Sequence, residues 1–198
     1  MKDIIENIVE ESIELKRKFI KKNTDLIIDG ADKISDCLIS GHKILIFGNG
    51  GSAADAQHIA AEFVNRFRIE RLPLAALALT TDTSILTSIG NDYSFDDIFA
   101  KQILALGKKH DIAIGISTSG NSKNVIKAVE ASKAIGIYTV VLTGRGGKLA
   151  SLADMIFPVE SDITARIQEV HILLGHIICE LVDRNLFPEQ FLMNPQKI

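Results

Sequence analysis

Short apolar runs alternate with helical patterns from residue 43 onward, and this alternation constrains the fold more than any other feature of the chain. The runs predict buried strands, and the segments between and after them predict helices. The predicted strands are KILIFG (43–48), LPLAALAL (72–79), DIAIGIS (111–117), YTVVLTG (138–144) and MIFPVE (155–160). The predicted helices cover residues 53–67, 95–107, 123–135 and about 164–184. Strands that alternate with helices form a parallel sheet covered on both faces, so we expect an α/β fold.

Two further helices are expected before the sheet. Residues 2–22 carry apolar side chains at a loose helical spacing. Asn23 is a favourable N-cap, which predicts a second helix that ends near Gly41. The chain has 198 residues and no linker-like segment, so we expect a single domain. Its N-terminal helices would cover residues 1–41, and its α/β core with a C-terminal helix would cover residues 42–198.

The charge and the cysteines exclude several classes of protein. The formal net charge is −3, so no global basic field is available for nucleic acid. The richest apolar stretch, residues 171–182, is too short and too polar to span a membrane. The N-terminal residues are interrupted by charges, unlike a signal peptide. Cys37 and Cys179 have no paired spacing, which excludes a disulfide scaffold and a cysteine metal cluster. We therefore expect a cytoplasmic protein without nucleic-acid or membrane partners.

A serine-rich loop between the third predicted strand and the next helix is suited to bind phosphate. Hydroxyls there can donate to an anion, and the helix N-terminus favours negative charge. Gly120 lets the backbone approach a ligand closely. The loop lacks the spacing of a nucleotide-binding P-loop, so a phosphomonoester on a small molecule fits better. The alternative is a turn that only caps the helix. The four hydroxyls belong to Ser117, Thr118, Ser119 and Ser122.

The glycine-rich loop GNGGS (48–52) resembles half of a dinucleotide-binding fingerprint. That fingerprint also needs an acidic residue about 20 positions later, and the nearest candidate, Asp82, comes about 30 positions later. Nicotinamide binding is therefore disfavoured. We expect instead that Asn49, Ser52 and backbone N–H groups contact a polyhydroxylated ligand.

A histidine and a glutamate share one face of an apolar helix. His58 and Glu62 are four residues apart, and Asp55 lies on the same face. Ile59, Phe63 and Phe67 form another face, which is expected to pack on the sheet. Because this helix begins right after the GNGGS loop, its polar face should border the ligand pocket. The alternative is a solvated polar stripe with a weak His–Glu pair.

The last predicted helix, residues 164–184, also carries polar side chains among apolar ones. Gln168 and His176 differ by eight residues, which corresponds to about 12 Å of rise and about 80° of rotation. They can share one ion only if their side chains converge, or if one of them comes from another subunit. His171 lies on a different face, and we interpret it as a core or interface histidine.

Four segments together resemble the sugar isomerase (SIS) domain family. They are GNGGSAADAQHIAAEF, IGNDYSFDDIF, GISTSGNSKNV and TARIQEVHILLGH. The resemblance implies a flavodoxin-like sheet, a homotetramer with sites at subunit interfaces, and one zinc per site. It implies the zinc ligands His58, Glu62, Gln168 and His176. It also implies that the substrate is contacted by Asn49, Gly50, Gly51, Glu62, Asn91, Asp92, Ser117, Thr118, Ser119, Ser122 and Gln168. One position departs from some members, because Ala165 stands where they carry an aspartate.

The resemblance is strongest to the branch of the family that isomerises sedoheptulose 7-phosphate. It implies conversion of this ketose phosphate to D-glycero-D-manno-heptose 7-phosphate through an enediol, at the first step of ADP-heptose and lipopolysaccharide core heptose synthesis. That chemistry needs a base and an acid, for which we expect Glu62 and His176. The alternative is a non-catalytic SIS protein of the replication-initiator-associated type, or a phosphosugar sensor. Such an adaptor has no need of Glu62 and His176 together.

Overall fold

The computed structural model describes residues 1–193 and contains a five-stranded, wholly parallel sheet. Its strands are β1 (Ile44–Gly48), β2 (Ala76–Ala78), β3 (Ile112–Ser117), β4 (Tyr138–Thr143) and β5 (Met155–Pro158). They are arranged in the order β2-β1-β3-β4-β5, which is the flavodoxin-like order. The predicted α/β class and the predicted strands are confirmed, although β2 is shorter than expected.

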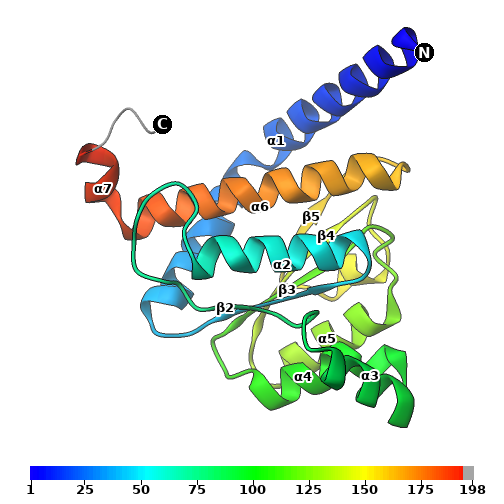
Figure 1. Cartoon of the computed structure of the whole chain (residues 1–198), viewed down its shortest axis with the longest axis vertical. Coiled ribbons are helices and arrows are strands. Elements are labelled where there is room, and N and C mark those ends of the chain that lie inside the picture. Colours follow the sequence, from blue (N-terminus) through cyan, green and yellow to red (C-terminus); the bar gives the residue numbers. More distant parts are fainter. Residues whose placement is uncertain (194–198) are drawn as a thin grey trace.

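Helices cover both faces of this sheet (Figure 1). The first face packs against α1, α2 and α6, and the second packs against α4 and α5. The α-helices are α1 (Lys2–Ile39), α2 (Gly51–Val64), α3 (Thr83–Asp92), α4 (Ile98–Leu106), α5 (Lys123–Ala134), α6 (Thr164–Leu186) and α7 (Pro188–Met193). Two 3₁₀ turns, η1 (Phe95–Asp97) and η2 (Lys148–Ser151), complete the described elements. No helix among residues 1–193 is both long enough and apolar enough to cross a membrane.

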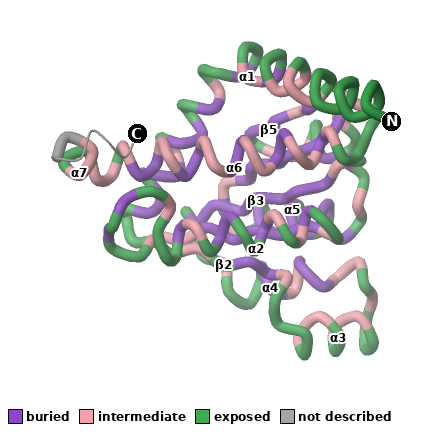
Figure 2. Tube along the Cα trace, turned by 45° about the horizontal axis from the view of Figure 1, so that its top comes forward, coloured by how far each residue is buried: buried purple, intermediate pink, exposed green. Residues whose placement is uncertain are grey.

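The strands are apolar on both faces because each face meets its own hydrophobic core. Ile44 and Ile46 of β1 join the core beneath α1, α2 and α6, whereas Leu45 and Phe47 join the core beneath α4 and α5. Figure 2 shows the central strands buried and the first turns of α1 exposed. Continuous apolar runs, rather than alternating ones, are what a doubly covered parallel strand requires.

The prediction of two N-terminal helices is wrong, because α1 runs without a break from Lys2 to Ile39. Asn23, the expected cap, is buried in the middle of α1, and its side-chain amide donates to the carbonyl of Phe19. An asparagine whose amide bonds to a carbonyl four residues earlier does not need to end the helix. The burial of neighbouring apolar residues such as Phe19 and Ile27 then keeps the helix continuous.

The segment between β2 and β3 also differs from the prediction. Residues 72–75 do not belong to β2, and Pro73 among them has no N–H to donate to a sheet. Helix α3 was not predicted. It begins after Asp82, whose carboxylate accepts a hydrogen bond from the Ile85 N–H at 2.9 Å. Asp82 is therefore the N-cap of α3, a role that differs from the ribose contact of a dinucleotide fingerprint.

Candidate functional site

Two polar loops meet at the carboxyl edge of the sheet, where ligands of such folds bind. The first follows β1 and the second follows β3, which are neighbouring strands. Asn49 of the first loop and Asn124 of α5 exchange two amide hydrogen bonds, both at 2.9 Å. The Asn124 side chain also accepts from the Val125 N–H. Asn124 was not singled out from the sequence, since only the fold places it against the GNGGS loop.

Gly50 and Gly51 open α2 and serve two different purposes. Gly50 is the N-cap and has a φ of 56°, which glycine adopts without strain. Gly51 makes room for Gln168, because a Cβ atom at this position would lie 2.3 Å from the Gln168 Nε2 atom. Helix α6 therefore brings Gln168 against the first turn of α2. Ser52, also predicted to contact ligand, is buried in that turn.

The hydroxyls of the loop after β3 lie close together. The Ser117 Oγ atom is 2.9 Å from Ser122 Oγ and 3.4 Å from Ser119 Oγ. Ser119 also accepts from the Asn121 N–H at 3.1 Å. Ser122 is the N-cap of α5, but its hydroxyl makes no capping hydrogen bond. The hydroxyl cluster at this helix N-terminus therefore remains suited to an anion.

A cavity of about 370 Å³ adjoins these hydroxyls, and one of its lining residues is Arg145, a cation that was not predicted from the sequence. Thr118, Ser119 and Arg145 line it together. The Arg145 guanidinium donates to Asp162 at 2.8 Å. This hydrogen bond lowers the pKa of Asp162, so the carboxyl is ionised at neutral pH. Asp162 is thus paired with a cation and is unsuited to act as a general acid in the role of the aspartate that some family members carry at the position of Ala165.

The second cluster joins α2 to α6 and contains three ligand-type groups. His58 and His176 face each other with their Nε2 atoms 2.9 Å apart, and His58 Nε2 lies 3.4 Å from Glu62 Oε1. One ligand atom from each of His58, Glu62 and His176 lies within 4.8 Å of the other two. Within residues 1–193, this is the one group of three or more His, Cys, Asp or Glu side chains with that geometry. Two imidazoles and one carboxylate are the protein ligands of many catalytic zinc sites, so the donor set fits zinc.

The surroundings of His176 favour its neutral form. Burial, followed by the charge of His58, lowers the pKa of His176 despite the opposing effect of Glu62. A neutral imidazole is the form that binds a metal. Phe67 stacks on the His176 ring with centroids 5.4 Å apart. The prediction that Phe67 belongs to helix α2 is wrong, because α2 ends at Val64, but Phe67 does pack against the core beneath α1, α2 and α6 as expected.

Asp55 lies one turn before His58, as predicted, and is partly buried. Its Oδ2 atom is shielded from solvent and has no hydrogen-bond partner among the described residues. Burial raises the pKa of this carboxyl, and the charge of His58 opposes the rise. Asp55 is therefore an acidic group close to the cluster that the described chain leaves unsatisfied.

Within one chain, the predicted site residues Gln168, Asn91 and Asp92 lie outside the cluster of His58, Glu62 and His176. Gln168 packs against Gly51, seven residues before His58, which corresponds to about 10 Å along α2. Its part in the metal site stays a prediction. Asn91 and Asp92 lie exposed at the end of α3, where the Asn91 amide donates to the Asp92 carboxylate at 2.8 Å. Their contact with a substrate stays a prediction as well.

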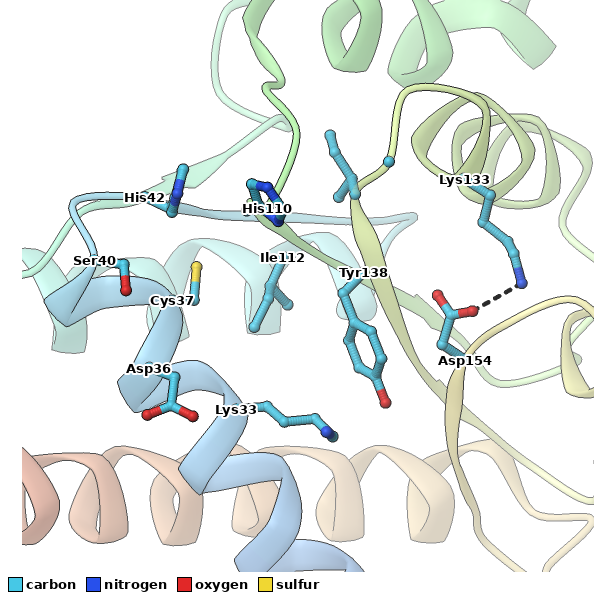
Figure 3. Close-up of a pocket in the computed structure, with 12 residues that line it drawn as sticks. Lys33, Asp36, Cys37, Ser40, His42, His110, Ile112, Lys133, Tyr138 and Asp154 are labelled. Atoms are coloured by element: carbon cyan, nitrogen blue, oxygen red, sulfur yellow. Dashed lines mark hydrogen bonds and ion pairs between the residues drawn. The ribbon is translucent and has the colours of Figure 1, made fainter.

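A larger cavity, about 710 Å³, lies at the opposite edge of the sheet (Figure 3). It is lined by residues that precede or begin strands, including His42, His110 and Tyr138, together with the end of α1. The imidazoles of His42 and His110 have centroids 5.5 Å apart, and Lys133 forms an ion pair with Asp154. None of the predicted site residues lines this cavity. We assign the candidate site to the polar loops at the carboxyl edge and to the ligand cluster between α2 and α6, and not to this larger cavity.

His171 is a core residue, which is one of the two interpretations that the sequence allowed. It is fully buried, and its Nε2 atom lies 3.1 Å from the carbonyl oxygen of Thr143. Its Nδ1 atom has no hydrogen-bond partner among the described residues. Burial lowers the pKa of His171 from 6.5 to about 4, so the imidazole is neutral in the folded protein at pH 7.

Acid is therefore expected to destabilise the fold through His171. The unfolded chain takes up a proton near pH 6.5, whereas the folded chain resists it until about pH 4. Stability present above pH 6.5 should thus be lost as the pH falls toward 4, by up to about 3 kcal/mol. His171→Leu removes the titrating group. The free energy of unfolding in urea should then fall less steeply with acid in the variant than in the wild type. Equal slopes would contradict the assignment.

Comparison with known proteins identifies the family. A family model described as the SIS domain matches residues 9–144, which is more than half of the chain. The chain belongs to the SIS domain family. The predicted resemblance is confirmed by this match.

Close relatives of this SIS domain chain are phosphoheptose isomerases. One from Nitratidesulfovibrio vulgaris is 54% identical over 193 residues, covering 97% of this chain and 92% of the relative. One from Aquifex aeolicus is 54% identical over 92% of this chain and 96% of its own. A solved phosphoheptose isomerase from Neisseria gonorrhoeae is 47% identical, with a TM-score of 0.87 over 92% of this chain and 98% of its own. That from Francisella tularensis is 40% identical, with a TM-score of 0.89 over 92% and 97%.

Proposed function

We propose that the chain is a phosphosugar isomerase that interconverts sedoheptulose 7-phosphate and D-glycero-D-manno-heptose 7-phosphate. The observation that carries this proposal is the meeting of Glu62 and His176 in one cluster between α2 and α6, in a chain that also holds a hydroxyl-rich loop after β3. The phosphoheptose isomerases that match nearly the whole chain support the same activity. The non-catalytic alternative is not favoured, because an adaptor needs neither the base nor its partner. NMR of the purified protein with sedoheptulose 7-phosphate, with and without chelator, tests the proposal.

The reaction requires a proton to leave C1 of the open ketose and to arrive at C2. Glu62 is the proposed base for this transfer, because it is half-buried and its carboxylate lies in the cluster with His58 and His176. A second proton moves between the oxygens on C1 and C2, or to the ring oxygen during opening. His176 is the proposed group for this step. The fully buried core beneath α2 and α6 holds both residues in place.

We further propose that His58, Glu62 and His176 hold zinc, with Gln168 as a further ligand from the same or a neighbouring subunit. A bound zinc ion supplies polarisation of the carbonyl and hydroxyl oxygens and stabilises negative charge on the enediolate. An imidazole that binds a metal through Nε2 cannot also donate a proton from that atom. The roles of His176 as ligand and as acid therefore exclude each other at one atom, and the metal experiment below separates them.

The phosphate is proposed to bind at the hydroxyls after β3, and the rest of the sugar at the GNGGS loop. Contacts to the sugar are assigned to Asn49, Gly50, Gly51, Ser52, Glu62, Asn91, Asp92 and Gln168, and contacts to the phosphate to Ser117, Thr118, Ser119 and Ser122. The hydroxyl cluster and its helix N-terminus support the second assignment. The amide pair between Asn49 and Asn124 supports the first, because it fixes the two loops next to each other.

Replacing both Ser119 and Ser122 with alanine is expected to weaken phosphosugar binding strongly. Each hydrogen bond to a charged group contributes about 1.5 to 3 kcal/mol, so two together correspond to a loss of about 100-fold or more in affinity. Because Ser122 makes no capping hydrogen bond, the melting temperature should change little. Calorimetry with the phosphosugar measures the effect, and sedoheptulose without phosphate is the control ligand. Unchanged affinity for the phosphosugar would show that these serines do not bind phosphate.

We propose a homotetramer, as the family resemblance implies. The support in this chain is the first third of α1, which projects beyond the body of the fold (Figure 1). Residues 1–11 are all exposed, although Ile4, Ile5, Ile8 and Val9 are apolar and between 45% and 63% exposed. An apolar patch on an exposed helical segment marks an interaction surface. Sedimentation of the full chain should give four copies per particle, and a monomer would contradict the proposal.

We also propose a cytoplasmic location. Cys37 and Cys179 are both free and buried. Burial raises the pKa of Cys37 to about 11 and that of Cys179 further, so both thiols stay protonated. Free thiols are typical of a reducing compartment, where sugar phosphates are also found.

A further inference from the structure

A fully buried ion pair joins the loop after α2 to helix α6. The Arg71 Nε atom donates to the Asp183 Oδ1 atom at 2.7 Å, and the side chains are 0% and 1% exposed. Asp183 comes from α6, whereas Arg71 belongs to the segment between α2 and β2. Neither Arg71 nor Asp183 belongs to the cluster of His58, Glu62 and His176 or to the loops after β1 and β3.

The other nitrogens of Arg71 hold the last turn of α2. Its Nη2 atom donates to the carbonyl of Glu62 at 2.9 Å, and its Nη1 atom donates to the carbonyl of Phe63 at 2.8 Å. Carbonyls in the last turn of a helix have no partner within the helix, and a nearby arginine can satisfy them. One of these carbonyls belongs to Glu62, a member of the metal cluster.

Asp183 stands on the same stripe of α6 as His176. Seven residues separate them, which is about 10 Å and 20° short of two full turns. Helices α2 and α6 run side by side in the same direction, since Gln168 meets Gly51 and Gly175 meets Ile59 further along. A Cβ atom on Gly175 would lie 2.7 Å from Ile59 Cδ1, so the two helices are in close contact next to the cluster. Arg71 therefore links the backbone of Glu62 to the stripe of α6 that carries His176.

The Arg71–Asp183 pair does not satisfy all of the hydrogen-bonding capacity that it buries. Asp183 Oδ2 is buried and has no hydrogen-bond partner among the described residues, so the carboxylate is only half satisfied. Buried ion pairs often contribute no more stability than apolar side chains of similar size. Their directional hydrogen bonds do, however, fix the groups that they join.

We infer that Arg71 is a positioning residue, which Asp183 orients and which fixes the Glu62 carboxylate relative to His176. The inference rests on the proposed metal-dependent isomerase. Groups that orient metal ligands typically change metal affinity or activity by 10- to 100-fold when they are replaced. Arg71 acts through the backbone of a ligand residue, so we expect an effect of this size.

The test replaces the pair in two ways. Arg71→Met with Asp183→Leu substitutes apolar side chains for both charges, which keeps the fold while it removes the directional bonds. Arg71→Lys keeps the charge but loses the planar fork that contacts Asp183 and both carbonyls. Arg184→Met is the matched control, because it breaks the partly exposed Arg184–Glu180 pair on the same helix. Zinc affinity is measured on the apoprotein against a chromophoric chelator, together with kcat, KM and the melting temperature.

The expected result is a 10- to 100-fold loss of zinc affinity and of kcat in both pair variants at a temperature where they are folded, with KM changed less and the control unchanged. Zinc affinity and kcat within about threefold of the wild type would overturn the inference, even if the melting temperature fell, because the pair would then be purely structural. If the double variant does not fold, Arg71→Lys decides by the same criteria. Failure of the proposed function looks different, since the wild type itself would then neither bind zinc nor isomerise the sugar.

Discussion

Glu62→Gln is expected to lower the turnover number by about 100-fold or more, because the reaction would lose its base. A positioned general base typically contributes 10²- to 10⁴-fold to the rate. Glutamine has nearly the same shape as glutamate, and the Glu62 side chain is 21% exposed at the surface of α2, so the fold should be retained. Turnover of sedoheptulose 7-phosphate, followed by NMR, measures the effect.

The matched control is Glu130→Gln on α5. Glu130 is also a helical glutamate, but its partner is Lys148 at 3.3 Å, and it lies outside the cluster. The control should isomerise the sugar at the wild-type rate. Turnover of Glu62→Gln within about threefold of wild type would remove Glu62 from the mechanism. Circular dichroism of both variants excludes misfolding as the cause of a loss.

His58→Ala and His176→Ala are each expected to lower zinc affinity by about 100-fold or more. Loss of a group that merely orients a ligand costs 10- to 100-fold, and loss of a ligand itself should cost at least as much. The two Nε2 atoms are 2.9 Å apart, so both imidazoles converge on one point. Titration of the apoprotein with zinc against a competing chelator measures the affinity, and isomerase assays follow the same samples.

His42→Ala is the control for the metal experiment. His42 also faces a second imidazole, that of His110, with centroids 5.5 Å apart compared with 5.1 Å for His58 and His176. His42 lies in the separate cavity beside the starts of β3 and β4, outside the cluster, so its loss should leave zinc binding at the proposed site unchanged. If His176→Ala abolished turnover while zinc bound as tightly as before, His176 would be an acid–base residue and not a ligand.

Local features of the sequence were sufficient to predict most of the architecture. Apolar runs of four to eight residues and the helical periods between them depend on neighbouring residues only, so the strands and most helices were predicted correctly. The pairing of His58 with Glu62 on one face is local for the same reason, since residues four apart on a helix are neighbours. The helix boundaries were predicted wrongly where a residue typical of a helix cap had a different hydrogen-bond partner in the folded chain. Asn23 resembles a cap, but its amide bonds to the Phe19 carbonyl within a buried helix.

Contacts between distant segments could be decided only by the tertiary structure. His58 and His176 are 118 residues apart, and their meeting depends on how α2 packs against α6. That packing includes the close contact of Gly175 with Ile59, which no period in the sequence reveals. Arg145, Asn124 and the buried pair of Arg71 with Asp183 were missed for the same reason. The sequence by itself determined which chemical groups are present and which helix or loop carries each. The tertiary structure decided which of them meet, because side-chain contacts across elements depend on helix packing and burial rather than on sequence spacing.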